Sequence, residues 1–291
     1  MPGQLFRSIF FVSVLSVKMI STTAQVVQEP KTANEEWGRQ YQPFRIAGNL
    51  YYVGTYDLAC YLITTAEGSI LINTGLAASA TQIKTNIEKL GFNLSDIKIL
   101  LTTQAHYDHM GAMAAIKKIT GAKMMVDEKD AAVLQDGGSS DYALGGNGST
   151  FQPVTPDRLL KNGDTVELGG MQLILLHHPG HTKGSCSFLF TVKDDNRSYK
   201  VLVANMPTIV TGKKFAEIAA YPGIAEDYAY TLAAMKNISF DIWLASHASQ
   251  FDLHEKHKTT DAYNPGAFID KAGFDAALDD LQKEYEAKLK E

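Results

Sequence analysis

The chain has 291 residues, of which 45% are hydrophobic, enough to bury a large core in one domain or in two fused halves. Its formal net charge is −5, and no block of basic residues occurs. Binding of nucleic acid depends on a concentrated positive surface that displaces counterions, so this charge pattern argues against a nucleic-acid partner.

The N-terminus has the composition of a secretory signal sequence. Arg7 precedes an apolar run over residues 8–17 that is too short to span a bilayer, and small residues follow up to Ala24. A lysine interrupts the apolar stretch, so an uncleaved amphipathic extension remains the alternative. No other stretch reaches membrane-spanning length. We therefore expect a signal peptide over residues 1–24, cleaved before Gln25, and a mature domain over residues 25–291.

Periodicity in the first half predicts strands separated by helices. Residues 49–73 alternate short apolar runs with turns, which is typical of an antiparallel meander. A helix marked by Ile83, Ile87 and Leu90 follows and ends at Gly91. The sequence then predicts a strand at 97–103, a helix at about 111–118, a strand at 122–126 and a helix at 127–135.

The segment after strand 97–103 concentrates polar groups that are costly to bury. Gln104-Ala105-His106-Tyr107-Asp108-His109 contains two imidazoles, a carboxylate and an amide, and a bound cation makes such a cluster favourable. Imidazole nitrogens with one carboxylate suit zinc better than calcium or magnesium. Because side chains alternate along an extended chain, Gln104 and His106 face one metal position, while Asp108 and His109 diverge toward a second.

Two more histidine-bearing segments follow apolar runs. Residues 173–176 lead into His177, His178 and His181, and residues 240–246 lead into His247. A lone histidine is more often a hydrogen-bonded structural residue, but three such strand ends in one chain are far less expected by accident. Because α/β folds place their chemistry at strand ends, we expect these segments to supply the remaining metal ligands.

The second half continues the alternation of strands and helices. Asn264-Pro265 is a favourable helix start, and apolar residues from Phe274 to Leu289 then share one helical face. Before this helix, the sequence predicts strands near 164–168, 171–176, 186–192 and 199–204, a helix at about 225–237 and a strand at 240–245.

The chain has two cysteines, Cys60 and Cys186. Export to an oxidising compartment would permit a bridge between them. Both lie in apolar runs, where buried free cysteine is common, so we expect two unpaired buried thiols.

The three polar segments together resemble a known pattern. Gln104-x-His106-x-Asp108-His109, then Pro179-Gly180-His181-Thr182, then Ser246-His247, are similar to the His-x-His-x-Asp-His … His … His pattern of the metallo-β-lactamase superfamily. The resemblance covers about residues 45–255, and its nearest branch is subclass B3, within it the GOB-type enzymes, which carry the same glutamine at the first position. Asn73 replaces the usual aspartate of the Asp-Thr-Gly turn, and its amide is expected to fix that turn.

The resemblance implies an α/β fold of the αβ/βα sandwich type. Two central mixed β-sheets would carry helices on their outer faces, with pseudo-halves at about 45–150 and 151–291 and the metal site at the edge between them. The resemblance also implies up to two Zn²⁺ ions per chain, one held by Gln104, His106 and His181, the other by Asp108, His109 and His247. An amide oxygen is a weaker zinc donor than imidazole, so the site with Gln104 should be the weaker.

The implied activity is that of a periplasmic β-lactamase, including carbapenemase activity, that confers antibiotic resistance. Zinc-activated water would open the lactam amide of penicillins, cephalosporins and carbapenems, and Asp108 would both bind metal and orient the attacking oxygen. Thr208 occupies the place of substrate-contacting serines of the B3 branch, and Tyr142 and Leu144, in the glycine-rich stretch 137–149, are candidate walls of the substrate site. We expect a monomer that acts on small β-lactam molecules, with no nucleic-acid partner and no membrane association after signal cleavage.

Two alternatives remain open. One is another hydrolase of the superfamily, such as a glyoxalase-II-like thioesterase or a lactonase; those branches usually carry a metal-bridging aspartate in the strand that corresponds to residues 203–206, and none is present here. The other is a secreted zinc-binding protein without catalysis. It would leave no open coordination position on the metal, whereas six ligands from three segments leave room for water on each ion.

Overall fold

The computed structural model describes residues 1, 3, 26–32, 34–195 and 197–291. The predicted signal peptide, apart from Met1 and Gly3, and its cleavage point lie outside the described residues. Within the described ranges, no helix combines the length and the apolar character needed to cross a membrane.

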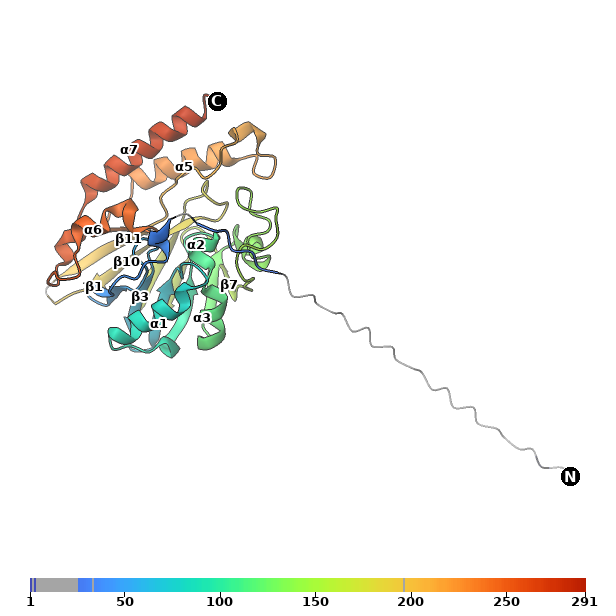
Figure 1. The fold of residues 1–291 in the computed structure, drawn as a ribbon, viewed down its shortest axis with the longest axis horizontal. Helices are drawn as coiled ribbons and strands as arrows, with labels where there is room; N and C mark the ends of the chain where they lie inside the picture. The colour runs from blue at the N-terminus through green and yellow to red at the C-terminus, as the bar shows by residue number, and fades with distance from the viewer. Residues whose placement is uncertain (2, 4–25, 33, 196) are drawn as a thin grey trace.

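Two mixed β-sheets lie in the centre of the molecule, with helices on the outer side of each (Figure 1). The first sheet contains, in spatial order, β1 (Phe44–Ala47), β2 (Leu50–Tyr52), β3 (Tyr61–Thr65), β4 (Gly68–Ile72), β5 (Ile97–Leu101), β6 (Lys123–Asp127) and β7 (Arg158–Leu160). The second contains β12 (Ile242–Ala245), β11 (Ser198–Ala204), β10 (Cys186–Lys193), β9 (Met171–His177) and β8 (Thr165–Leu168). In the first sheet the strands pair antiparallel from β1 to β4 and parallel from β4 to β7. In the second they pair antiparallel from β8 to β11, and β12 joins β11 in parallel.

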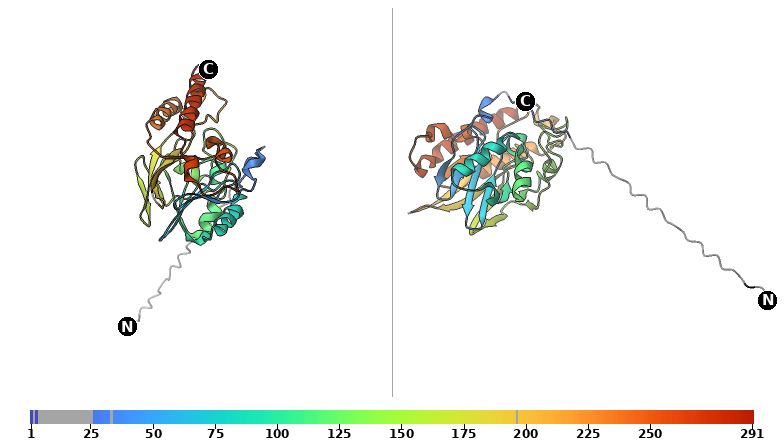
Figure 2. Two further views of the ribbon diagram at one scale, coloured as in Figure 1. Left: turned by 90° about the vertical axis from the view of Figure 1, so that its left-hand side faces the viewer. Right: turned by 60° about the horizontal axis from the view of Figure 1, so that its bottom comes forward.

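The helices form two outer layers (Figure 2). Helices α1 (Ser79–Lys89) and α3 (Met113–Thr120) pack on the first sheet, and α5 (Ile224–Lys236) and α7 (Lys271–Lys288) pack together on the second. This arrangement confirms the predicted αβ/βα sandwich. The shorter elements are α2 (Tyr107–Met110), α4 (Ala131–Gln135), α6 (Leu253–Lys256) and the 3₁₀ turns η1 (Glu35–Trp37), η2 (Leu94–Asp96), η3 (Phe215–Glu217), η4 (Ala248–Phe251) and η5 (Pro265–Phe268).

Strands β4 and β5 are apolar on both faces because each lies between two layers. Ile70 and Ile72 of β4 belong to the core between the sheets. Leu71, between them, points the other way and joins Leu100 of β5 in a second core, against Ile83 of α1. Burial on both faces explains why these strands are nearly continuous apolar runs in the sequence.

Most predicted elements are present, and two helix starts were predicted wrongly for local reasons. The helix expected over 127–135 begins only at Ala131, because Asp127 ends β6 and its carboxylate accepts the Lys129 N–H at 2.9 Å, which forms a turn. The sequence also gives no signal for β1 and β7, which are four and three residues long.

The C-terminal helix begins at Lys271 and not at Asn264-Pro265. The Asn264-Pro265 pair instead starts the short turn η5. Asp270 then caps α7, because its carboxylate accepts the Gly273 N–H at 2.8 Å and so satisfies an N–H group at the open end of the helix.

Two further expectations concern the cysteines and the halves of the chain. Cys60 and Cys186 are both buried and free, which confirms the prediction of unpaired thiols. The first sheet extends beyond residue 150, because β7 pairs with β6. The division into pseudo-halves at 45–150 and 151–291 remains a proposal.

Leu100→Ala tests the layer between the first sheet and its helices. Leu100 is 0% exposed, so we expect the truncation to lower the free energy of unfolding by about 2–5 kcal/mol through lost burial and a residual cavity. Leu159→Ala, on β7 and 51% exposed, is the matched control and should change it by less than about 0.5 kcal/mol. Urea titration measures both. Equal effects would contradict the described packing.

Candidate metal centre

The metal-binding run leaves the first sheet at the end of β5. A turn over residues 102–106 follows Leu101, and Tyr107 then begins α2. Asn73, at the end of β4 with φ of 61°, holds this turn because its side-chain oxygen accepts the Thr103 N–H at 2.9 Å. Asn73 therefore fixes the turn without a charge, as the sequence predicts.

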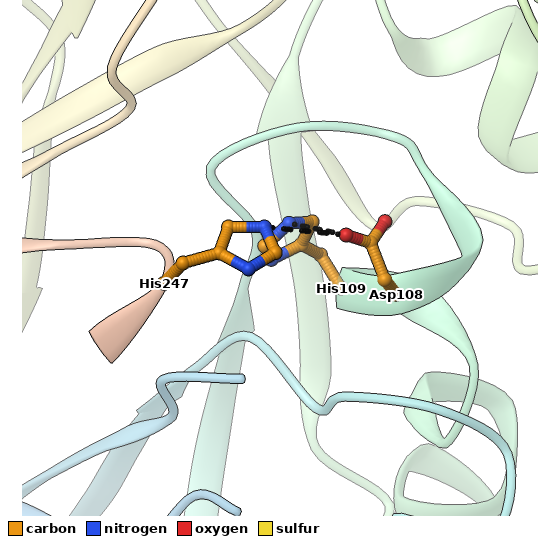
Figure 3. A group of neighbouring side chains, drawn as sticks. All are labelled: Asp108, His109 and His247. Carbon is orange, nitrogen blue, oxygen red and sulfur yellow. Dashed lines mark ion pairs between the residues drawn. The ribbon is translucent and has the colours of Figure 1, made fainter. Parts of the chain in front are cut away.

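Asp108, His109 and His247 form one cluster (Figure 3). Asp108 Oδ2 lies 3.2 Å from His109 Nε2 and 3.3 Å from His247 Nε2. One ligand atom from each residue lies within 4.8 Å of the other two, although His247 comes from the second sheet. The structure thus brings together the three residues predicted for the second zinc.

Gln104, His106 and His181 form the neighbouring group. The His106 and His181 rings lie 4.9 Å apart between centroids. All three residues are buried, with exposed fractions of 3%, 3% and 6%. His106 precedes α2, and His181 follows β9 in the loop that begins at His178.

The donor set fits zinc because polar atoms of these residues are buried without partners. Among the described residues, eight buried side-chain atoms lack a hydrogen-bond partner, and three of them can face a metal at this centre: Gln104 Oε1, His109 Nε2 and His181 Nε2. An unpaired buried polar atom costs about 1–3 kcal/mol, so three of them in one place indicate a bound cation. Nitrogen donors with one carboxylate favour zinc.

The charge states of two of the ligands, Asp108 and His181, agree with this assignment. Burial alone would raise the pKa of Asp108, but His109 and His247 outweigh it and hold that pKa well below its usual range. Burial lowers the pKa of His181 to about 3, so this imidazole is neutral and its lone pair is free for a metal. Both states are those that metal ligation needs.

Acceptors behind the histidines fix their rings. His181 Nδ1 donates to the Thr208 carbonyl oxygen at 2.8 Å. His247 Nδ1 lies 3.2 Å from Asp57 Oδ2, which also accepts the indole N–H of Trp37 at 3.0 Å. Such partners select the tautomer that leaves Nε2 for the metal. Sequence reasoning missed Asp57, which stands in an irregular segment far from any histidine.

Asp130 joins two ligand-bearing segments and was also missed. Its Oδ2 accepts the Ala105 N–H at 3.0 Å and the Thr182 hydroxyl at 2.7 Å, and its Oδ1 accepts the Gly184 N–H at 2.7 Å. Burial raises the pKa of Asp130 to about 6. Gly184 permits this approach, because a Cβ there would lie 2.4 Å from the Asp130 nitrogen.

The predicted substrate contacts lie around the first group. The Thr208 hydroxyl is 3.0 Å from His181 Nδ1. The Tyr142 hydroxyl donates to the carbonyl oxygens of Gly180 and His181, both at 3.1 Å, and so holds the His181 loop. Leu144 is partly buried against the core on the helix side of the first sheet. Contact of these residues with substrate remains a proposal.

Comparison with known proteins agrees with this geometry. The family model of the metallo-β-lactamase superfamily matches residues 55–195. The class B3 di-zinc metallo-β-lactamase LRA-12 from an Alaskan soil metagenome is 69% identical, and the match covers 90% of this chain and 100% of that one with a TM-score of 0.90. The chain belongs to the class B3 metallo-β-lactamases. The metallo-β-lactamase GOB-18 from Elizabethkingia meningoseptica is 61% identical over 92% of this chain and 99% of that one, with a TM-score of 0.91.

Curated relatives match this class B3 metallo-β-lactamase over shorter regions. The hydroxyacylglutathione hydrolase GloC of Haemophilus influenzae is 31% identical over 47% of this chain and 63% of that protein. The chain spans less than two thirds of the length of the first curated relatives it matches.

The Gln104→His substitution tests the strength of the first group. Imidazole is a better zinc donor than an amide, so we expect one of two zinc ions to bind at least about tenfold more tightly, equal to about 1.4 kcal/mol. The other ion, on Asp108, His109 and His247, should keep its affinity. Zinc titration against a competing chelator measures both. Two equally tight ions in the unsubstituted protein, with no gain in the variant, would refute the predicted filling order.

Proposed function

We propose that this class B3 chain is a zinc-dependent β-lactamase that hydrolyses the lactam amide of penicillins, cephalosporins and carbapenems. The observation that carries the proposal is the convergence of three distant segments on two groups of donor side chains, several of whose polar atoms are buried without a partner, in a chain 69% identical to a di-zinc metallo-β-lactamase over that protein's whole length. Gln104, His106 and His181 would hold one zinc ion, and Asp108, His109 and His247 the other.

When bound, zinc would supply a water of lowered pKa and a positive charge that stabilises the oxyanion and the nitrogen anion that develop during hydrolysis. The chain's own residues prepare the site for this chemistry. Asp108 is held as an anion, so its carboxylate can orient the attacking water while it binds metal. The Thr208 carbonyl and Asp57 keep His181 and His247 in fixed orientations, so the reacting atoms need no rearrangement of the ligands.

The thioesterase or lactonase alternative has less support. Asn205 stands in the segment 203–206 where those branches carry a bridging aspartate, and its side-chain oxygen is used by the Ser246 hydroxyl at 3.3 Å. The relatives named as hydroxyacylglutathione hydrolases match at lower identity and over less of this chain than the class B3 enzymes. A non-catalytic zinc protein has less support from the comparisons, because the chain is 69% identical to a class B3 di-zinc metallo-β-lactamase.

The place of action is part of the same proposal. The signal-like N-terminus favours export to the periplasm, with cleavage after Ala24. We propose a monomer there that meets free β-lactam molecules and contributes to antibiotic resistance.

Metal removal is the first test. Hydrolysis of a penicillin, a cephalosporin and a carbapenem is followed by absorbance, before and after treatment with a chelator. We expect turnover of all three to disappear on chelation and to return with zinc, because the attacking water depends on the metal. Turnover of thioesters or lactones without any β-lactam turnover would transfer the assignment to the other hydrolases.

Asp108→Asn is the second test. The amide keeps the shape but loses the charge and one acceptor oxygen, so we expect kcat to fall by about 10²-fold or more, equal to about 2.7 kcal/mol of barrier. Glu284→Gln removes an exposed charge on α7 and should leave kcat unchanged. Steady-state kinetics in zinc-replete buffer compares the two. Near-normal turnover of the Asp108 variant would exclude it from the mechanism.

A further inference from the structure

One carboxylate outside the six predicted ligands lies against the first group. Asp141, in the glycine-rich loop 137–149, places Oδ2 3.4 Å from His106 Nε2, and both side chains are 3% exposed. This separation is an ion-pair contact, slightly longer than an ordinary N–H···O hydrogen bond. No atom in the described part of the chain is a hydrogen-bond partner of His106 Nε2, so Asp141 is the available acceptor.

The loop fixes the direction of the Asp141 side chain. Oδ1 accepts the N–H groups of Ala143 at 2.9 Å and Leu144 at 2.7 Å, which leaves Oδ2 for His106. The Asp141 carbonyl oxygen accepts the Gly145 N–H at 3.1 Å, and a Cβ at Gly145 would lie 2.4 Å from that oxygen. This glycine is therefore needed for the loop to close around Asp141.

The next residue of the loop contacts the other histidine of the same group. The Tyr142 hydroxyl donates to the carbonyl oxygens of Gly180 and His181 at 3.1 Å each. Two adjacent loop residues thus contact the segments of His106 and His181 from one side. The loop therefore restricts the positions of His106 and His181, the two histidines grouped with the weak donor Gln104.

Asp141 does not lie where a shared zinc ligand would be. Among the described residues, Asp108, His109 and His247 are the only three His, Cys, Asp or Glu residues with ligand atoms all within 4.8 Å of one another. Asp141, His106 and His181 do not meet that condition. The ion-pair contact of the Asp141 carboxylate is with His106 Nε2.

We propose that Asp141 is a positioning residue for the first zinc site: its carboxylate accepts the Nε2–H of His106 and presents the other ring nitrogen, Nδ1, to the metal. An acceptor of this kind fixes the tautomer and ring orientation and makes the imidazole a stronger donor. At this site that gain offsets the weak, neutral amide of Gln104. The proposal rests on the ligand sets of the proposed function, but its tests measure zinc binding and ring chemistry, so absence of β-lactam turnover would leave it standing.

The Asp141→Asn substitution tests the effect on zinc. The asparagine oxygen can keep the bonds to Ala143 and Leu144, while an NH₂ group replaces Oδ2 opposite His106. We expect one of two zinc ions to bind about 10–100-fold more weakly in a chelator-competition titration, the other to be unaffected, and the metal-free melting temperature to be unchanged. Asp136→Asn, directly before the loop and with its Oδ2 accepting the Ser140 N–H, is the matched control and should bind both ions normally. Wild-type affinity in Asp141→Asn, equal loss in both variants, or loss at both sites would overturn the proposal.

Nitrogen-15 NMR of the histidine rings in the zinc-loaded protein tests the tautomer. We expect His106 to carry its proton on Nε2 with Nδ1 bound to metal, and this ring N–H to exchange with water faster in Asp141→Asn. His109 should keep its spectrum in the variant and serves as the internal reference. A zinc-bound Nε2 on His106 would refute the role assigned to Asp141 whatever the affinities.

Discussion

Six side chains proposed to bind metal meet at one edge of a sandwich whose core is apolar, and the surrounding structure must compensate for their burial. Strand β5 is almost fully buried up to Leu101, and the chain then places Gln104, His106, Asp108 and His109 where water hardly reaches. Charges removed from water cost several kcal/mol each unless they are paired. Zinc removes most of this cost. Part of it is offset by carboxylates outside the six proposed ligands.

Three such carboxylates divide the task. Asp57 holds His247, Asp130 holds the backbone before His106 and the loop after His181, and Asp141 faces His106. They come from three separate parts of the chain. Together they contact all three ligand segments, so the position of the metal depends on the closed fold as a whole. A small shift in the backbone of any of these loops would displace the ligand side chains, because a closely packed interior transmits such a shift.

The sequence predicts the ligands well and their supports poorly, for one physical reason. The ligands lie in short runs at strand ends that combine imidazole, carboxylate and amide groups. Such a local combination is uncommon except at metal sites, so it can be recognised in the sequence. The supporting carboxylates are single residues among 32 acidic ones, and only the folded chain brings Asp57 to His247, 190 positions away. The fold follows the same rule. Doubly buried strands such as β4 are evident from their apolar runs, whereas β7 is too short to be recognised and is defined by its pairing with β6.

The Trp37–Asp57 contact gives this centre an optical property. The indole ring of Trp37 lies 5.5 Å from the imidazole of His247, and the only other tryptophan, Trp243, is buried in β12. Imidazolium and carboxylate groups next to an indole alter its excited state. Binding of a metal in place of a proton on His247 would change the field at Trp37 and leave Trp243 as a constant background. The protein would thus carry an intrinsic fluorophore that responds to occupancy of the proposed His247 metal position, without any added label.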